Sequence, residues 1–341
     1  MSITPQAIDS TSEHFIEPQA PKADALKRVR TLSGAKALDT GPDLSGEKVG
    51  TRFIASVAIA NYINLIKPHV TVLLLGITVA TMAIAQKGLP DLGLVVATLL
   101  GGAMAAGSAN CLNCYLDRDI DQIRGRTQRR SLPSGRVQPT HALIFGIVLG
   151  IASFLELTAF VNLLSAVLAF SAILFYIFVY TLGLKRTTAQ NIVIGGAAGA
   201  VPVLVGWAAI TNSLSLAAIW LFAIIFYWTP PHFWALSLLI QKDYEKARVP
   251  MLPVLMGEDE TRRQIFLYSL LLVAVTLILF VMRVMGYFYL SFALALGGIL
   301  IYMSIRLMRD KTNYWARTIF WYSNCYLAAI FAVMVIDRVL Q

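Results

Sequence analysis

The chain has 341 residues; 57% of them are hydrophobic and only 14% are charged. This composition excludes an ordinary soluble domain. The formal net charge is +9, but Lys and Arg recur in alternate loops between apolar segments. They do not form the continuous basic surface that a nucleic-acid-binding protein needs. The sequence therefore predicts an all-α, polytopic membrane bundle in a lipid bilayer, with no nucleic-acid partner.

Residues 1–55 precede the apolar segments and are polar, with many Ser, Pro, Ala and Gly residues. Such a composition buries too little apolar surface to fold, so we expect a disordered, cytoplasmic N-terminal tail. Its acidic residues argue against a mitochondrial transit peptide. These residues are Asp9, Glu13, Glu17 and Asp24. A bacterial inner membrane is the expected location, and a mitochondrial inner membrane is the alternative.

Nine apolar segments of about 20 residues follow, a length that crosses a bilayer as a helix. We expect residues 56–341 to form one domain of nine transmembrane helices. The expected spans are residues 69–86, 92–114, 140–160, 162–182, 189–210, 215–238, 265–284, 288–305 and 318–337. Lys and Arg concentrate before the first span and in every second loop, which predicts a cytoplasmic N-terminus and a C-terminus on the opposite side.

A polar motif stands where the second expected span meets its cytoplasmic loop. Asn113, Asp117 and Asp121 are spaced four residues apart, so a helix presents them on one face. Carboxylate and amide oxygens suit Mg²⁺, which completes its shell with water and substrate phosphates. A solvated helix end is the alternative, but Asn113 lies deeper in the span, where an unpaired amide is unfavourable. With the arginines that follow, the motif predicts binding of a lipid diphosphate through a metal ion.

Other charged residues have two open interpretations. Asp243, in the loop after the sixth span, either pairs with Lys242 or Lys246 or helps to hold a second Mg²⁺ across the bundle. Lys185 and Arg186 follow the fourth span. They set the orientation of the chain in the membrane, or they contact the diphosphate. Lys67, before the first span, has the same two interpretations.

The sixth span contains Pro230 and Pro231, which remove backbone donors and are expected to kink or unwind the helix. Such a break favours a pocket, with His232 and Trp234 near it. His232 and His69 are either satisfied core residues or ligands of haem iron or of an acidic group.

Five segments resemble one known family, the UbiA-type intramembrane prenyltransferases, and within it the branch that farnesylates protohaem IX. The aspartate motif alone is typical of the whole superfamily. The segments around His232 and after Asp243 are specific to the haem branch. The segments are Tyr115–Asp121, Arg126–Arg136, Leu184–Gly196, Pro231–Ala235 and Asp243–Pro253.

The resemblance implies the UbiA-type fold and a transfer of the farnesyl group of farnesyl diphosphate to haem B. Addition of water would give haem O and diphosphate, for haem O and haem A synthesis in terminal oxidases. Haem A synthase or oxidase assembly proteins are possible partners. Mg²⁺ is the implied cofactor. The implied catalytic and metal-binding residues are Asn113, Asp117, Asp121 and Asp243.

The diphosphate-binding residues expected from this resemblance are Lys67, Arg126, Arg130, Lys185, Arg186 and Lys242. The expected haem-binding residues are His232, Trp234 and His69. Two alternatives stay open. The first is a prenyltransferase of the same fold that acts on a quinone precursor or another aromatic acceptor. The second is a nine-span transporter or lipid-binding scaffold whose acidic residues are ion sites. A transporter would usually place its charges near the bilayer midplane.

Overall fold

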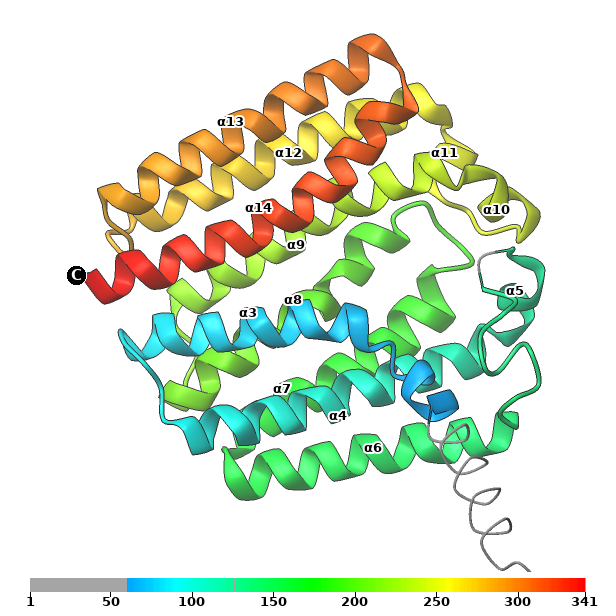
Figure 1. Cartoon of the computed structure of the whole chain (residues 1–341), viewed down its shortest axis with the longest axis horizontal. Coiled ribbons are helices and arrows are strands. Elements are labelled where there is room, and N and C mark those ends of the chain that lie inside the picture. Colours follow the sequence, from blue (N-terminus) through cyan, green and yellow to red (C-terminus); the bar gives the residue numbers. More distant parts are fainter. Residues whose placement is uncertain (1–59, 126, 341) are drawn as a thin grey trace, which may run out of the picture. The chain divides into compact units, whose positions relative to one another are not determined.

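The computed structural model describes residues 60–125 and 127–340 (Figure 1). The expected tail, residues 1–55, and Arg126 lie outside the described residues, as does the side chain of His69. The described part of the chain consists of helices and connecting turns, without a strand. The predicted all-α membrane bundle is therefore confirmed.

Within residues 60–125 and 127–340, nine long helical segments correspond to the nine expected spans. Their bounds are α3 Pro68–Gln86, α4 Leu92–Leu116, α6 Pro139–Phe160, α7 Leu163–Leu174 with its continuation η1 Phe175–Leu184, α8 Asn191–Thr211, α9 Leu216–Leu239, α12 Gly257–Val281, α13 Tyr287–Asp310 and α14 Asn313–Leu340. The segment η1 is a π-helix. Three short helices lie in the connecting loops: α5 Arg118–Ile123, α10 Gln241–Lys246 and α11 Leu252–Leu255.

Eight of these segments are long and apolar enough to cross a membrane. The exception is α3, which corresponds to the first expected span. Its apolar part, Thr71–Gln86, is shorter than the others. At 1.5 Å per residue this part rises only ~24 Å, less than the ~30 Å thickness of a bilayer core. The chain is a polytopic membrane protein, in which α3 packs against α4, α8 and α14.

The long helices pack in chain order and close on themselves. Each one contacts the next, from α3 and α4 to α13 and α14, and α14 returns to contact α3 (Figure 1). Small residues permit close approaches inside this arrangement. A Cβ atom on Gly206 of α8 would lie 2.6 Å from the carbonyl oxygen of Thr78 in α3. Only glycine therefore lets these two helices meet.

The two long loops meet at one end of the bundle, where Figure 1 shows α5 beside α10. A small apolar cluster joins them to the start of α8; it includes Ile120, Ile192, Tyr244, Val249 and Met251. The guanidinium carbon of Arg124 lies 4.4 Å from the ring centre of Tyr244. The loops after α4 and α9, which are distant in sequence, therefore form one structure over the polar end of the spans.

Candidate active site

Asn113, Asp117 and Asp121 form a buried row at the junction of α4 and α5. Asp117 ends α4 and precedes α5. Its N–H donates to Asn113 O at 2.9 Å, and the N–H of Asp121 donates to Asp117 O at 2.8 Å. The helical spacing therefore continues across the junction. All three residues are buried.

A network of side chains from three helices surrounds the first two residues of this row. Asn113 Nδ2 donates to Asp117 Oδ2 at 2.7 Å and to Thr181 Oγ1 at 3.2 Å. Lys67 Nζ, at the start of α3, donates to Asn113 Oδ1 at 3.3 Å. Lys185 Nζ, at the end of η1, forms an ion pair with Asp117 Oδ2. The structure thus brings together two of the basic residues expected to bind diphosphate.

The π-helix η1 sets the position of Lys185. The N–H of Lys185 donates to Tyr180 O, five residues earlier, at 2.8 Å. This wider turn places Thr181 against Asn113 and Lys185 against Asp117. Both pairs of residues are separated by four positions, so the two helices contact each other at two successive turns. π-Helical turns are frequent at functional sites. Burial lowers the pKa of Lys185, and the Asp117 carboxylate opposes this effect.

Asp117 has one oxygen without a partner. Its Oδ1 atom is buried and accepts no hydrogen bond from the described residues, an arrangement that typically costs about 1–3 kcal/mol. A bound cation would satisfy this oxygen. The described residues contain no group of three or more His, Cys, Asp or Glu side chains placed to hold a metal. This sparse set of oxygen donors fits Mg²⁺, which takes one or two carboxylates and obtains its other ligands from water and phosphates.

Asp121 and Asp119 have different arginine partners. Arg130 Nη1 donates to Asp121 Oδ2 at 2.8 Å, so the loop after α5 folds back onto the row. Arg186 makes two bonds of 2.7 and 2.8 Å to the exposed Asp119 carboxylate. These hydrogen bonds lower the pKa of Asp119. Asp119 therefore lies away from the row, and Arg186 is held at the surface beside it.

The second loop places Asp243 close to the first loop. A Cβ atom on Gly125 would lie 3.9 Å from Asp243 Oδ1. Among the described side chains, Asp243 forms no ion pair with Lys242 or Lys246. The Lys242 side chain is exposed. Of the two interpretations of Asp243, the ion pair with Lys242 or Lys246 is therefore absent among the described side chains.

Sequence reasoning assigned no role to two further residues here. Thr181 orients the Asn113 amide, and its four-residue spacing from Lys185 was the available signal. Arg124 is buried, and two of its guanidinium nitrogens, Nε and Nη2, have no hydrogen-bond partner in the part of the chain that the structure describes. In the sequence, Arg124 is one of several arginines in the same loop, and nothing distinguishes it from the others.

His232 lies in a rigid aromatic setting between α9 and α14. Its ring stacks between Trp228, at 4.4 Å, and Phe320, at 4.7 Å. Its Nδ1 atom lies 2.8 Å from Ser323 Oγ. Because α9 remains helical through Pro230 and Pro231, the expected unwinding does not occur.

Trp234 is only 1% exposed and packs edge-on against Tyr268 of α12, at 5.2 Å. The aromatic contacts of His232 are with Trp228 and Phe320. The two residues expected near one pocket therefore contact different helices, because their two-residue separation points them to different faces of α9.

Comparison with known proteins agrees with this architecture. The sequence matches the UbiA prenyltransferase family over residues 73–325. A protoheme IX farnesyltransferase of Gloeobacter violaceus is 53% identical over 287 residues, which cover 83% of this chain and 93% of the relative. One from Trichodesmium erythraeum is 52% identical, covering 81% and 85%. One from a Roseiflexus species is 50% identical, and the chain spans about half (52%) of its length.

Solved structures of the same fold are more distant in sequence. A digeranylgeranylglyceryl phosphate synthase superposes with a TM-score of 0.69 at 17% identity, covering 83% of this chain and 99% of the synthase. A UbiA homologue from Archaeoglobus fulgidus bound to DMAPP and Mg²⁺ gives 0.58 at 15%, covering 80% and 99%. These two comparisons support the fold, and the curated relatives identify the branch. The chain therefore belongs to the UbiA prenyltransferase family and, within it, to the protohaem IX farnesyltransferases.

Proposed function

We propose that the protein transfers the farnesyl group of farnesyl diphosphate to a vinyl group of haem B, giving haem O and diphosphate after water is added. The names of its bacterial relatives support this acceptor. The observation that carries the chemistry is the buried row of Asn113, Asp117 and Asp121, with an unpartnered Asp117 oxygen and basic residues on either side.

The residues of the row and their basic neighbours would have different roles in binding the diphosphate: the row would hold the metal ion, and the basic residues would contact the phosphate oxygens. Asp117 and Asp121 would hold Mg²⁺, with Asn113 orienting them and Asp243 as a further ligand from the second loop. When bound, Mg²⁺ supplies Lewis-acid stabilisation of the leaving diphosphate. Lys67 and Lys185 already lie on the row. Their charges would stabilise the negative charge that develops on the leaving oxygens.

Three further basic residues would also contact the diphosphate, as the sequence predicts. Arg130 is already paired with Asp121 and would exchange this carboxylate for a phosphate oxygen. Lys242 and Arg186 would approach from the exposed rim. Their long side chains can turn toward a bound anion without a change in the backbone.

The bundle interior would protect the reacting carbon. Cleavage of the C1–O bond of farnesyl diphosphate leaves an allylic cation, which water would convert to farnesol. Apolar helix faces exclude water during this step. The haem vinyl group then supplies the electron pair for the new carbon–carbon bond. Water captures the resulting cation and loses a proton, which places the hydroxyl group of haem O.

His232 is the residue that we place at the haem. With its hydrogen donated to Phe320 O at 2.9 Å, Ser323 Oγ would accept from Nδ1–H of His232, which lies 2.8 Å away. This tautomer leaves a lone pair on Nε2, the form in which imidazole binds iron. Ser323 would thereby act as a positioning residue, as outer hydrogen-bond acceptors do for metal-binding histidines.

We further propose a bacterial plasma membrane location with a cytoplasmic N-terminus. The distribution of Lys and Arg along the sequence supports this orientation. The site would then open to the cytoplasm, where farnesyl diphosphate and Mg²⁺ are available. The haem O product would pass to haem A synthase or to oxidase assembly proteins in the same membrane.

One assay tests the proposed reaction. Purified protein is incubated with haem B, farnesyl diphosphate and Mg²⁺. The haem pigments are then separated and identified by mass spectrometry. We expect the haem O mass, together with release of diphosphate. Prenylation of a quinone precursor without any haem O would instead assign the protein to another acceptor.

A further inference from the structure

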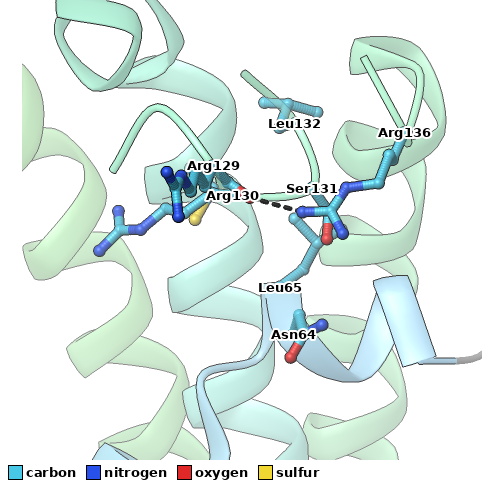
Figure 2. Close-up of a pocket in the computed structure, with 8 residues that line it drawn as sticks. Asn64, Leu65, Arg129, Arg130, Ser131, Leu132 and Arg136 are labelled. Atoms are coloured by element: carbon cyan, nitrogen blue, oxygen red, sulfur yellow. Dashed lines mark hydrogen bonds between the residues drawn. The ribbon is translucent and has the colours of Figure 1, made fainter. Parts of the chain in front are cut away.

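A second basic site lies beside the row, in a cavity of about 320 Å³. Three arginines of the loop after α5 surround it: Arg129, Arg130 and Arg136 (Figure 2). Its lining also includes the buried apolar side chains Leu65 and Leu132. We call this cavity the arginine pocket. A lining that combines arginine with apolar side chains suits an amphipathic anion.

The arginine pocket has positive charge that no carboxylate neutralises. Arg136 is fixed by hydrogen bonds to Arg129 O, drawn in Figure 2, and to Ser134 Oγ. Among the described residues, neither Arg129 nor Arg136 forms an ion pair with Asp or Glu. Arg130 alone is paired, with Asp121. Two guanidinium groups therefore remain available for an anion.

The surroundings of the arginine pocket favour a lipid over a soluble anion. The loop that supplies the arginines ends where α6 begins, at Pro139. Beyond its first turn, α6 exposes Ile144, Ile147 and Ile151, an apolar face suited to acyl chains. Basic pockets at the polar end of transmembrane helices are typical sites for anionic headgroups.

We infer that the arginine pocket binds the phosphate group of an anionic phospholipid. Arg129 and Arg136 pair with the phosphate oxygens, and the acyl chains follow the outer face of α6. A zwitterionic lipid binds less well, because its own cation meets the surplus positive charge. Arg130 connects this pocket to the row, since this residue lines the cavity and its guanidinium group pairs with Asp121.

The test measures lipid binding and requires no turnover, so it is independent of the proposed reaction. Native mass spectrometry follows the titration of the detergent-solubilised, full-length protein with phosphatidylglycerol or phosphatidylcholine. The variant Arg129→Gln/Arg136→Gln is compared with Arg263→Gln/Arg309→Gln, which removes the same charge from the ends of α12 and α13. We expect preference for phosphatidylglycerol and a loss of about 30-fold in its affinity in the first variant only.

Three results would overturn the inference. These are unchanged phosphatidylglycerol affinity in the first variant, equal binding of phosphatidylcholine by the unaltered protein, and a parallel loss of farnesyl diphosphate affinity, which would assign the pocket to the substrate. Arg129→Gln alone retains the carbonyl that accepts from Arg136, so it preserves the loop if the double variant does not fold. For this variant the expected loss of affinity is about fivefold.

Discussion

Lys185 pairs with only one oxygen of the Asp117 carboxylate. Asp117 Oδ2 accepts from both Lys185 and Asn113, whereas Oδ1 is buried without a partner. The carboxylate is therefore neutralised by a lysine ammonium and still has an open coordination position. A metal ion bound to Oδ1 would therefore join Lys185 in balancing the charge of this carboxylate.

The two carboxylates of the row should be essential. Asp117→Asn and Asp121→Asn keep the side-chain volume and remove the negative charge. We expect each to reduce haem O formation about 100-fold or more, the usual range for loss of one preorganised electrostatic contact. Turnover of purified protein measures this effect. Asp119→Asn is the matched control, because its carboxylate faces Arg186 at the surface; near-normal turnover of either row variant would remove that residue from the mechanism.

Removal of Lys185 should increase the effect of Mg²⁺ on stability, because both cations neutralise the Asp117 carboxylate. Lys185→Met leaves the Asp117 carboxylate buried without its cation, and loss of one partner of a buried pair costs about 3 kcal/mol or more. We expect a lower melting temperature without Mg²⁺ and a larger rise on adding Mg²⁺ than the unaltered protein shows. Thermal unfolding in detergent measures both, with the exposed Lys246→Met as control. Equal Mg²⁺ responses would mean that Lys185 and the ion do not share Asp117.

The close packing of α8 against η1 should be required for both stability and activity. A Cβ atom on Gly195 would lie 2.2 Å from Tyr180 Cδ2, whereas one on Gly199 meets nothing within 4 Å. Both residues lie in α8, so alanine raises helix propensity equally. We expect Gly195→Ala to be less stable than Gly199→Ala by about 1–3 kcal/mol. It should also lose activity, because Tyr180 accepts the N–H of Lys185. Identical melting temperatures and rates for the two variants would contradict this argument.

The tautomer of His232 predicts a spectroscopic result. Haem B titrated into the protein should give a Soret band typical of histidine ligation, and His232→Ala should lose this band. Ser323→Ala should weaken haem binding by about tenfold, the lower range for loss of a supporting hydrogen bond. Ser237→Ala is the control, because this buried serine of α9 bonds to Trp234 O instead. A haem spectrum unaffected by His232→Ala would exclude the histidine as a ligand.

Removal of divalent metal should stop farnesyl transfer. With excess chelator we expect no diphosphate release, and Mg²⁺ should restore it. Ca²⁺ should restore it poorly, because it prefers more ligands at longer distances than this sparse set of oxygens provides. Full activity in chelator would show that lysine and arginine charges suffice for the reaction.

The sequence alone determined the membrane bundle and the row of oxygen-bearing side chains. Long apolar segments can satisfy their backbone groups in lipid only as helices, and the four-residue spacing of Asn113, Asp117 and Asp121 fixes their common face. Both features depend on local periodicity. They were therefore readable before any tertiary contact was known.

The tertiary structure decided which charges meet. In sequence, Lys185 and Arg186 are adjacent, yet Lys185 pairs with the buried Asp117 and Arg186 with the exposed Asp119. The extra residue in the π-helical turn of η1 sets this choice, together with the packing of η1 against α4. Contacts between residues 68 positions apart depend on helix register and packing, which local spacing does not specify. The role of Thr181 emerged for the same reason.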